Sequence, residues 1–211
     1  MHKKFKPIDA VLLIGPTGSG KTPLGDYIEQ KGIAGRRCLH FDFGHELRTL
    51  VGAVDLPSGF TQAEHQFIVD VLEKGQLLED RHFPIAEKIV QNFMSCRGCS
   101  ESDLVILNGL PRHEGQARDM ARLVNVTGLF VLDCAAEDVR ARIGQNTGGD
   151  RSRRTDDSVE MIRKKLTIFR DRTEPLIGYY SGRGSFLLRM RVDASSTTED
   201  LYSRLISFFL A

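Results

Sequence analysis

A glycine-rich loop follows the first apolar run of the chain and constrains the fold more than any other feature. Residues 15–22 read Gly-Pro-Thr-Gly-Ser-Gly-Lys-Thr and fit the pattern G-x-x-x-x-G-K-[ST]. The run Ala10–Ile14 before them is typical of a buried strand, and the segment after them predicts a helix. In this setting the backbone N–H groups and the helix N-terminus both face an anion. The loop therefore predicts a site for a nucleoside triphosphate.

The side chains of this loop are expected to have separate tasks. Lys21 should reach the β- and γ-phosphates, and Thr22 should ligate the Mg²⁺ that accompanies ATP. Pro23 is compatible with the motif, because the first helical turn has no acceptors for its N–H groups. Four further residues are expected to surround the phosphates: Gly15, Gly18, Ser19 and Gly20.

Apolar runs alternate with helix-like segments along the 211 residues. Because these runs are continuous rather than alternating with polar residues, they favour strands buried on both faces. The pattern predicts a single three-layer, doubly wound α/β domain over 1–211 with a five-stranded parallel sheet. The five expected strands are Ala10–Ile14, Cys38–Phe43, Leu104–Leu107, Gly128–Leu132 and Phe186–Val192.

Two stretches exceed what simple connections need. Residues 44–102 separate the second and third strands, and helices are expected near Gln62–Glu73 and Phe83–Met94. We interpret this stretch as an inserted helical region. Residues 144–154 are rich in glycine and basic residues, which is typical of a linker or a lid. A short lid over about residues 144–155 is the interpretation that we prefer.

The charge balance excludes some classes of partner. Lys and Arg total 29 and Asp and Glu total 28, so neither nucleic acid nor an anionic membrane surface is expected as the main partner. Apolar runs fall short of the roughly 18–20 residues that a membrane span needs, and a cytoplasmic protein is expected. Cys96 and Cys99 form an isolated C-x-x-C, which we interpret as two loop thiols.

Several segments outside the loop carry a resemblance to a known family. An Asn-Gly-Leu-Pro-Arg segment ends at Arg112 and is followed by Gln116. This segment is similar to the Asp-Gly-Phe-Pro-Arg and later Gln of adenylate kinase and its nucleoside monophosphate kinase relatives. The resemblance covers nearly the whole chain in the family's order. Its other segments are Gly44–Arg48, Gly75–Asp80, Arg154–Asp157, Thr173–Tyr180 and Val192–Ala194.

The resemblance implies roles for individual residues. Arg48 and Arg112 would grip the acceptor phosphate, and Gln116 would read the acceptor base. Arg142 would lie against the donor base, and Arg154 would meet the transferring phosphate. Three further residues are assigned to the acceptor side: Leu78, Gly109 and Arg163.

Phosphoryl transfer needs positive charge around the migrating group more than covalent chemistry. Lys21, Arg112, Arg142, Arg154 and either Arg163 or Lys165 could supply that charge. The resemblance places Lys165 at the family's second catalytic arginine, where it offers a point charge without a bidentate fork. Asp156 and Asp157 are expected to cap a helix, with metal binding as the alternative, and in the family these carboxylates also help to hold the lid closed.

The chain departs from the family at positions expected to contact the metal ion and the acceptor base. Asn108 replaces the aspartate that orients Mg²⁺, and Phe43 replaces a threonine that contacts the acceptor base. We therefore expect a divergent monomeric kinase that transfers the γ-phosphoryl of ATP·Mg²⁺ to a nucleoside monophosphate. AMP is the first candidate, and UMP, CMP or another small phosphate remain open. The alternatives are a nucleotide-binding sensor or assembly protein with weak transfer, and a small-metabolite kinase.

Overall fold

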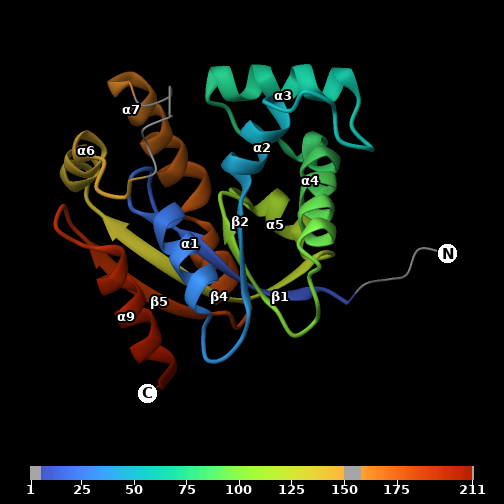
Figure 1. Ribbon diagram of the computed structural model, residues 1–211. Coiled ribbons are helices and arrows are strands. Elements are labelled where there is room, and N and C mark those ends of the chain that lie inside the picture. The colour runs from blue at the N-terminus through green and yellow to red at the C-terminus, as the bar shows by residue number, and fades with distance from the viewer. Residues whose placement is uncertain (1–5, 150–157, 211) are drawn as a thin grey trace.

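Five parallel strands form one sheet in the order β2-β3-β1-β4-β5 (Figure 1). The computed structural model describes residues 6–149 and 158–210. Every pair of neighbouring strands in the sheet is parallel, which confirms the predicted parallel α/β fold. The strands are β1 (Ile8–Ile14), β2 (Cys38–Asp42), β3 (Leu104–Asn108), β4 (Val124–Cys134) and β5 (Phe186–Val192).

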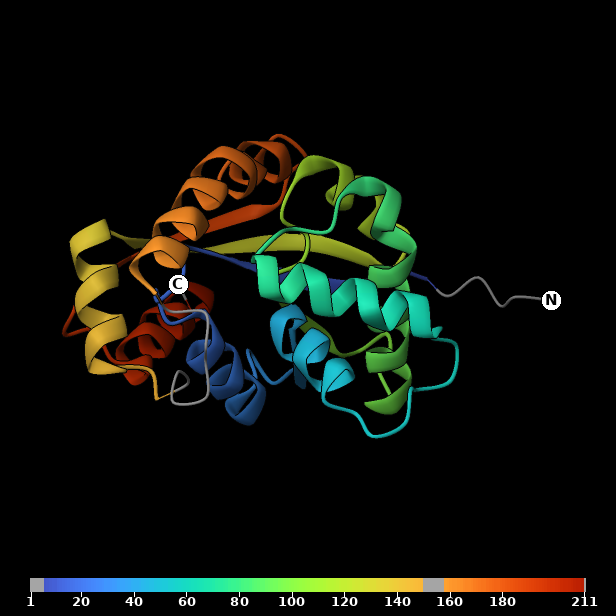
Figure 2. The same cartoon turned by 90° about the horizontal axis from the view of Figure 1, so that it is seen from above.

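Helices cover both faces of the sheet, as Figure 2 shows. One face packs against α1 (Lys21–Lys31) and α9 (Thr198–Leu210). The other face packs against α2 (Phe43–Val51), α3 (Gln62–Lys74), α4 (Phe83–Cys96), α5 (Glu114–Met120) and α8 (Leu176–Ser181). The remaining helical segments are α6 (Ala136–Gln145), α7 (Val159–Ile168), a 3₁₀ turn (Asp80–His82) and a π-helical turn (Phe169–Thr173) that joins α7 to α8.

The side chains of β1 show why this strand is apolar from Ala10 to Ile14. Leu12 and Ile14 are buried in the core on the α3–α4 face, whereas Val11 and Leu13 are buried in the core on the α1–α9 face. Because a strand points successive side chains to opposite faces, a strand covered on both sides needs apolar residues at every position. The three-layer architecture predicted from the continuous apolar runs is thus confirmed.

The end of β2 differs from the prediction. The predicted strand extends to Phe43, but β2 ends at Asp42 and Phe43 is the first residue of α2. The carboxylate of Asp42 causes this break, since its Oδ1 accepts a hydrogen bond from the His45 backbone N–H at 2.9 Å and caps the helix. Helix α2 was not predicted from the sequence.

The inserted helices of residues 44–102 agree with the sequence pattern. The predicted helices near Gln62–Glu73 and Phe83–Met94 correspond to α3 and α4 and are confirmed. Thr61 and Glu64 form a reciprocal capping box that begins α3. Both helices contribute buried apolar residues to the same core as β1, β2 and β3. The insertion is therefore packed on the sheet.

Part of the expected lid cannot be placed. Arg154, Asp156 and Asp157 lie outside the described residues. The helix that follows, α7, has Ser158 as its N-cap, and the Ser158 hydroxyl accepts a hydrogen bond from the Met161 N–H at 3.2 Å. In the described ranges, 6–149 and 158–210, every helix is too short or too polar to cross a membrane.

Candidate active site

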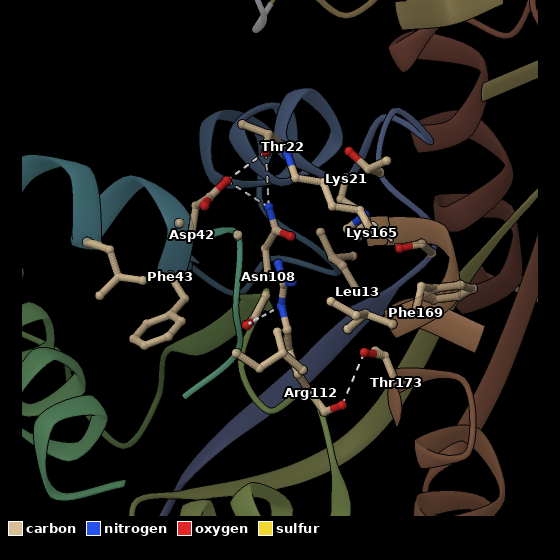
Figure 3. A pocket seen from close by; sticks show the side chains of 18 of the residues that line it. Leu13, Lys21, Thr22, Asp42, Phe43, Asn108, Arg112, Lys165, Phe169 and Thr173 are labelled. Atoms are coloured by element: carbon tan, nitrogen blue, oxygen red, sulfur yellow. Dashed lines mark hydrogen bonds between the residues drawn. The ribbon is translucent and has the colours of Figure 1, made fainter. Parts of the chain in front are cut away.

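The cavity that carries the predicted residues lies at the carboxyl ends of β1, β2 and β3. Asp42 and Asn108 are register partners at the ends of β2 and β3, and Asn108 is also paired with Leu13 near the end of β1. This is the edge of a parallel sheet at which ligands bind. Figure 3 shows Asp42 and Phe43 on one side of Asn108, and Lys165 and Phe169 on the other. All of these side chains line one cavity.

The glycine-rich loop has the backbone geometry that its sequence predicts. Gly18 and Gly20 have φ angles of 79° and 95°, which disfavour residues with a β-carbon. The Nζ of Lys21 donates to the carbonyl oxygens of Gly15 and Pro16 at 2.7 Å each. These are bonds that a bound phosphate would compete for. The lysine therefore lies over the loop in which a phosphate chain would sit.

Ser19 contributes to this loop through its backbone. Its side chain is fully buried, and within residues 6–149 and 158–210 the hydroxyl has no hydrogen-bond partner. The backbone N–H of Ser19 donates to the carbonyl oxygen of Pro16 at 3.3 Å, which closes the turn. Ser19 is absent from the cavity lining, whereas Gly15, Gly18 and Gly20 line it.

Thr22 contacts a carboxylate that the sequence analysis did not single out. The Thr22 hydroxyl donates to Oδ2 of Asp42 at 2.6 Å. The amide Nδ2 of Asn108 donates to the same Asp42 oxygen at 2.9 Å and to the Thr22 hydroxyl oxygen at 3.1 Å (Figure 3). His40 is buried behind this triangle, with Nε2 at 3.5 Å from the Asn108 amide nitrogen. The three side chains form one connected polar group.

The environment of Asp42 favours its ionised form. Burial raises the pKa of the carboxyl, but the hydrogen bonds from the Thr22 hydroxyl and the His45 N–H lower it, as do the positive charges of His40 and Arg48. The net pKa lies below the ordinary value of 3.8. A fixed negative charge therefore stands next to Thr22 at neutral pH.

One part of the cavity wall is built around Arg112, the residue expected to grip the acceptor phosphate. Its Nε donates to the Gly109 carbonyl oxygen at 3.0 Å, and its backbone carbonyl accepts from the Thr173 hydroxyl at 3.1 Å. Gln116 is buried, and its Oε1 accepts from the Arg112 N–H at 2.8 Å while its Nε2 donates to the Leu78 carbonyl oxygen at 2.8 Å. The structure thus brings together four of the residues that were assigned to the acceptor, namely Leu78, Gly109, Arg112 and Gln116.

Positive side chains dominate this cavity. Of the predicted cations, Arg48 lines it from α2 and Lys165 lines it from α7. In the described part of the chain, Asp42 is the one carboxylate among the lining residues. The cations that line the cavity are Lys21, Arg48, Arg112, Arg142 and Lys165.

Arg142 has a more structural setting than its assigned role implies. It is 4% exposed, and its guanidinium donates to the carbonyl oxygens of Gly18, Asp193 and Ser196 at 3.2, 2.8 and 2.8 Å. These bonds tie the phosphate loop to the loop after β5. Arg142 therefore holds two parts of the cavity wall together, and stacking on a donor base stays a prediction.

The structure does not bring Arg163 to the cavity. Its side chain is exposed and is absent from the cavity lining, whereas Lys165 lies on the lining face of the same helix. Two residues along an α-helix lie roughly 200° apart, so Arg163 and Lys165 cannot share one face. The acceptor-binding assignment of Arg163 finds no support in this geometry, and Arg154 lies outside the described residues.

A preformed metal cluster is not part of the described structure. Residues 6–149 and 158–210 contain no group of three or more His, Cys, Asp or Glu side chains that could hold an ion. Cys96 and Cys99 are free thiols at and after the end of α4.

Asp42 is the residue that sequence reasoning missed. A signal was present, because an aspartate that ends an apolar run stands at the sheet edge where the glycine loop also lies. The sequence does not show, however, that β3 lies between β2 and β1 in the sheet. The contact of Asp42 with Thr22 depends on this strand order.

Comparisons with curated proteins give relatives that match nearly the whole chain. The chain is 29% identical to an adenylate kinase of Thermus thermophilus over 205 residues, which cover 93% of this chain and 94% of that protein. It is 28% identical to adenylate kinase isoenzyme 1 of Sus scrofa over 207 residues, covering 97% and 95% of the two chains. UMP-CMP kinase 1 of Oryza sativa subsp. japonica is 25% identical over 208 residues, which cover 97% of this chain and 75% of that protein.

Solved structures agree with the fold. A gluconokinase from Sinorhizobium meliloti 1021 superposes with a TM-score of 0.53 at 13% identity, covering 97% of this chain and 92% of that one. A sugar kinase from Janibacter sp. HTCC2649 superposes with a TM-score of 0.52 at 15% identity, covering 96% and 95%. No protein-family model matches the sequence. Over nearly its whole length the chain is thus similar to adenylate kinases and UMP-CMP kinases, and this similarity, the glycine-rich loop and the cationic cavity support a divergent nucleoside monophosphate kinase.

Proposed function

We propose that this protein transfers the γ-phosphoryl group of ATP to a nucleoside monophosphate, with AMP as the principal acceptor. The observation that carries the proposal is a single cavity with the glycine loop at one side and the Arg112–Gln116 turn at the other. The loop would bind a triphosphate, and the turn places Arg112 beside the side-chain amide of Gln116, which is held by two hydrogen bonds. Two such sites facing each other are what direct transfer between two nucleotides requires.

The donor would occupy the loop between β1 and α1. Backbone N–H groups and the N-terminus of α1 would surround the β- and γ-phosphates, and Lys21 would exchange its two carbonyl partners for phosphate oxygens. Arg142 would keep the loop in place through its bond to the Gly18 carbonyl. This chain thus holds the donor mainly with its backbone, which suits a loop rich in glycine.

The acceptor would lie against α2 and the start of α5. Arg48 and Arg112 would bind its phosphate, and Gln116 and the Leu78 backbone would meet its base. We propose residues 44–102 as the acceptor-binding region and residues 144–155 as a lid. Phe43 lines the same cavity, so its ring would replace the polar contact that a threonine makes. AMP as the acceptor rests on the adenylate kinases among the relatives, and the UMP-CMP kinase keeps pyrimidines open.

The charge of the cavity suits transfer of a phosphoryl group. Lys21, Arg112 and Lys165 would stabilise negative charge that spreads over the oxygens of the migrating group. Closure of the cavity around both nucleotides would exclude water, which otherwise competes as the acceptor. Repeated transfer of the phosphoryl group to an acceptor would distinguish a kinase from a nucleotide sensor of the same fold.

The oxygen ligands of the donor side fit Mg²⁺. The Thr22 hydroxyl oxygen and the Asp42 carboxylate are hard oxygen donors, and they lie next to the expected position of the β- and γ-phosphates. Bound Mg²⁺ neutralises charge on those phosphates and fixes their orientation. Thr22 and Asp42 are the residues that would hold it.

The test is to incubate the purified protein with ATP and Mg²⁺ and each of AMP, GMP, CMP, UMP and dTMP, and to follow diphosphate formation by chromatography. We expect turnover with AMP and slower or no turnover with the others. Preference for another monophosphate would revise the acceptor, and ATP binding without transfer to any of them would favour the sensor. Light scattering after gel filtration would test the expected monomer.

A further inference from the structure

The cavity has one negative side chain among many positive ones in the described part of the chain. Asp42 is that side chain, and its Oδ2 is directed at Thr22 of the glycine loop. A carboxylate that is partly removed from water is costly unless its charge has a partner. The partners of Oδ2 in the structure are the Thr22 hydroxyl and the Asn108 amide, and neither carries a charge. This environment suits a cation that arrives with the ligand.

The two oxygens of Asp42 have separate tasks. Oδ1 accepts from the His45 backbone N–H at 2.9 Å and fixes the start of α2, while Oδ2 accepts from Thr22 at 2.6 Å. The first bond prevents the carboxylate from turning away from the loop. Oδ2 therefore stays beside Thr22 independently of any ligand.

The direction of the Thr22 bond matters for metal binding. The hydroxyl gives its proton to Asp42 and accepts one proton from the Asn108 amide at 3.1 Å, which leaves one lone pair of its oxygen for an ion. Mg²⁺ binds oxygens at about 2.0–2.1 Å in an octahedron, so neighbouring ligand oxygens lie about 2.9 Å apart. The 2.6 Å separation of the Thr22 and Asp42 oxygens is close to that spacing.

We propose that Asp42, at the end of β2, is the carboxylate that directs Mg²⁺ to the ATP site, and that Asn108 is the neutral donor that holds it there. The inference rests on the proposed binding of ATP at the glycine loop. Asn108 stands where the family resemblance has an aspartate that orients Mg²⁺. The carboxylate that we propose in its place, Asp42, lies on the neighbouring strand, at the register partner of Asn108.

The arrangement allows one carboxylate at this place but not two. Asn108→Asp would put a second carboxylate at the position of the amide, which lies 2.9 Å from Asp42 Oδ2. Two like charges at that distance disfavour joint ionisation, and the donated hydrogen bond would be lost. The same change in an Asp42→Asn background would restore a single charge with a neutral partner. The two substitutions are therefore expected to compensate for each other.

The experiment measures how strongly Mg²⁺ improves binding of the non-hydrolysable ATP analogue AMP-PNP, by calorimetry with Mg²⁺ and with EDTA. The ratio of the two affinities reports metal binding without any acceptor or turnover. We expect Asp42→Asn to lower this ratio by about 10- to 100-fold, Asn108→Asp to lower it, and the double variant to recover most of it. Asp42→Asn keeps an N-cap residue for α2, and thermal unfolding checks that it folds.

Asp119→Asn is the matched control, because it removes one negative charge from the surface of α5, where Asp119 pairs with Arg122. Its ratio should equal that of the wild type. The proposal is overturned if Asp42→Asn keeps the wild-type ratio, if the double variant is no better than the single ones, or if Mg²⁺ has no effect on the wild type. Normal metal coupling without transfer to any acceptor would instead overturn the proposed kinase function alone.

Discussion

The backbone N–H of Arg112 donates to the side-chain Oε1 of Gln116 at 2.8 Å. The other end of the same amide donates to the Leu78 carbonyl oxygen at 2.8 Å. One side chain thus connects the segment after β3 with the inserted helical region, and it fixes the position of the arginine backbone. The residue expected to grip the acceptor phosphate and the residue expected to meet the acceptor base are held as one unit.

Replacement of Arg112 by alanine tests the acceptor side. We expect Arg112→Ala to lower the rate of phosphoryl transfer by about 10³-fold, because the migrating group loses a fixed positive charge. The affinity for ATP should change little, since Arg112 lies across the cavity from the glycine loop. Steady-state kinetics and ATP titration measure the two effects. Arg118→Ala on the exposed side of α5 is the control, and an unchanged transfer rate in Arg112→Ala would refute the assignment.

Loss of the Gln116 amide should cost stability as well as acceptor binding. Gln116→Leu would leave the Arg112 N–H and the Leu78 carbonyl without this partner in a buried place. We therefore expect the free energy of unfolding to fall by about 1–3 kcal/mol. Urea denaturation measures this change. Gln66→Leu on the exposed face of α3 should stay within about 0.5 kcal/mol of wild type. Equal effects of the two substitutions would contradict the bridging role of Gln116.

Two helical glycines should respond in opposite ways to alanine. A β-carbon at Gly25 in α1 would overlap the imidazole ring of His40, which is buried behind Asn108 and bonded to Asp26 at 2.8 Å. We expect Gly25→Ala to destabilise the protein by about 1–3 kcal/mol. A β-carbon at Gly144 in α6 meets nothing within 4 Å, so Gly144→Ala should stabilise by about 0.5–1 kcal/mol. Thermal or denaturant unfolding distinguishes them, and a shift of the same sign in both would contradict the expected overlap.

Asp193 should make acid stability depend on pH in a defined window. Hydrogen bonds from the hydroxyls of Ser195 and Ser196 and from the Ser195 N–H hold the pKa of Asp193 at about 2, below the ordinary value of 3.8. Because the folded state binds the proton less tightly, this stabilisation is present above about pH 4 and is lost as the pH falls toward 2. The difference in unfolding free energy between wild type and Asp193→Asn should therefore shrink over that window. A difference that stays constant would refute the low pKa.

The sequence predicted the donor side of the site better than the rest. The glycine loop is a local motif, so its lysine, threonine and glycines could be identified without knowledge of the fold. Lys21, Thr22 and the loop glycines line the cavity as expected. Arg142 shows what the sequence could not predict. The sequence indicated a cation near the nucleotide, but the fold buries its guanidinium against three backbone carbonyl oxygens.

The sequence by itself indicated the parallel sheet and the glycine-rich loop, since continuous apolar runs and the loop motif are both patterns of residues that are neighbours along the chain. Only the tertiary structure decided which carboxylate stands beside Thr22. Asp42 lies 20 positions from Thr22 and 66 positions from Asn108, and these three meet because β3 lies between β2 and β1 in the sheet. Strand order is set by the packing of all helices on both faces, so no local pattern carries it.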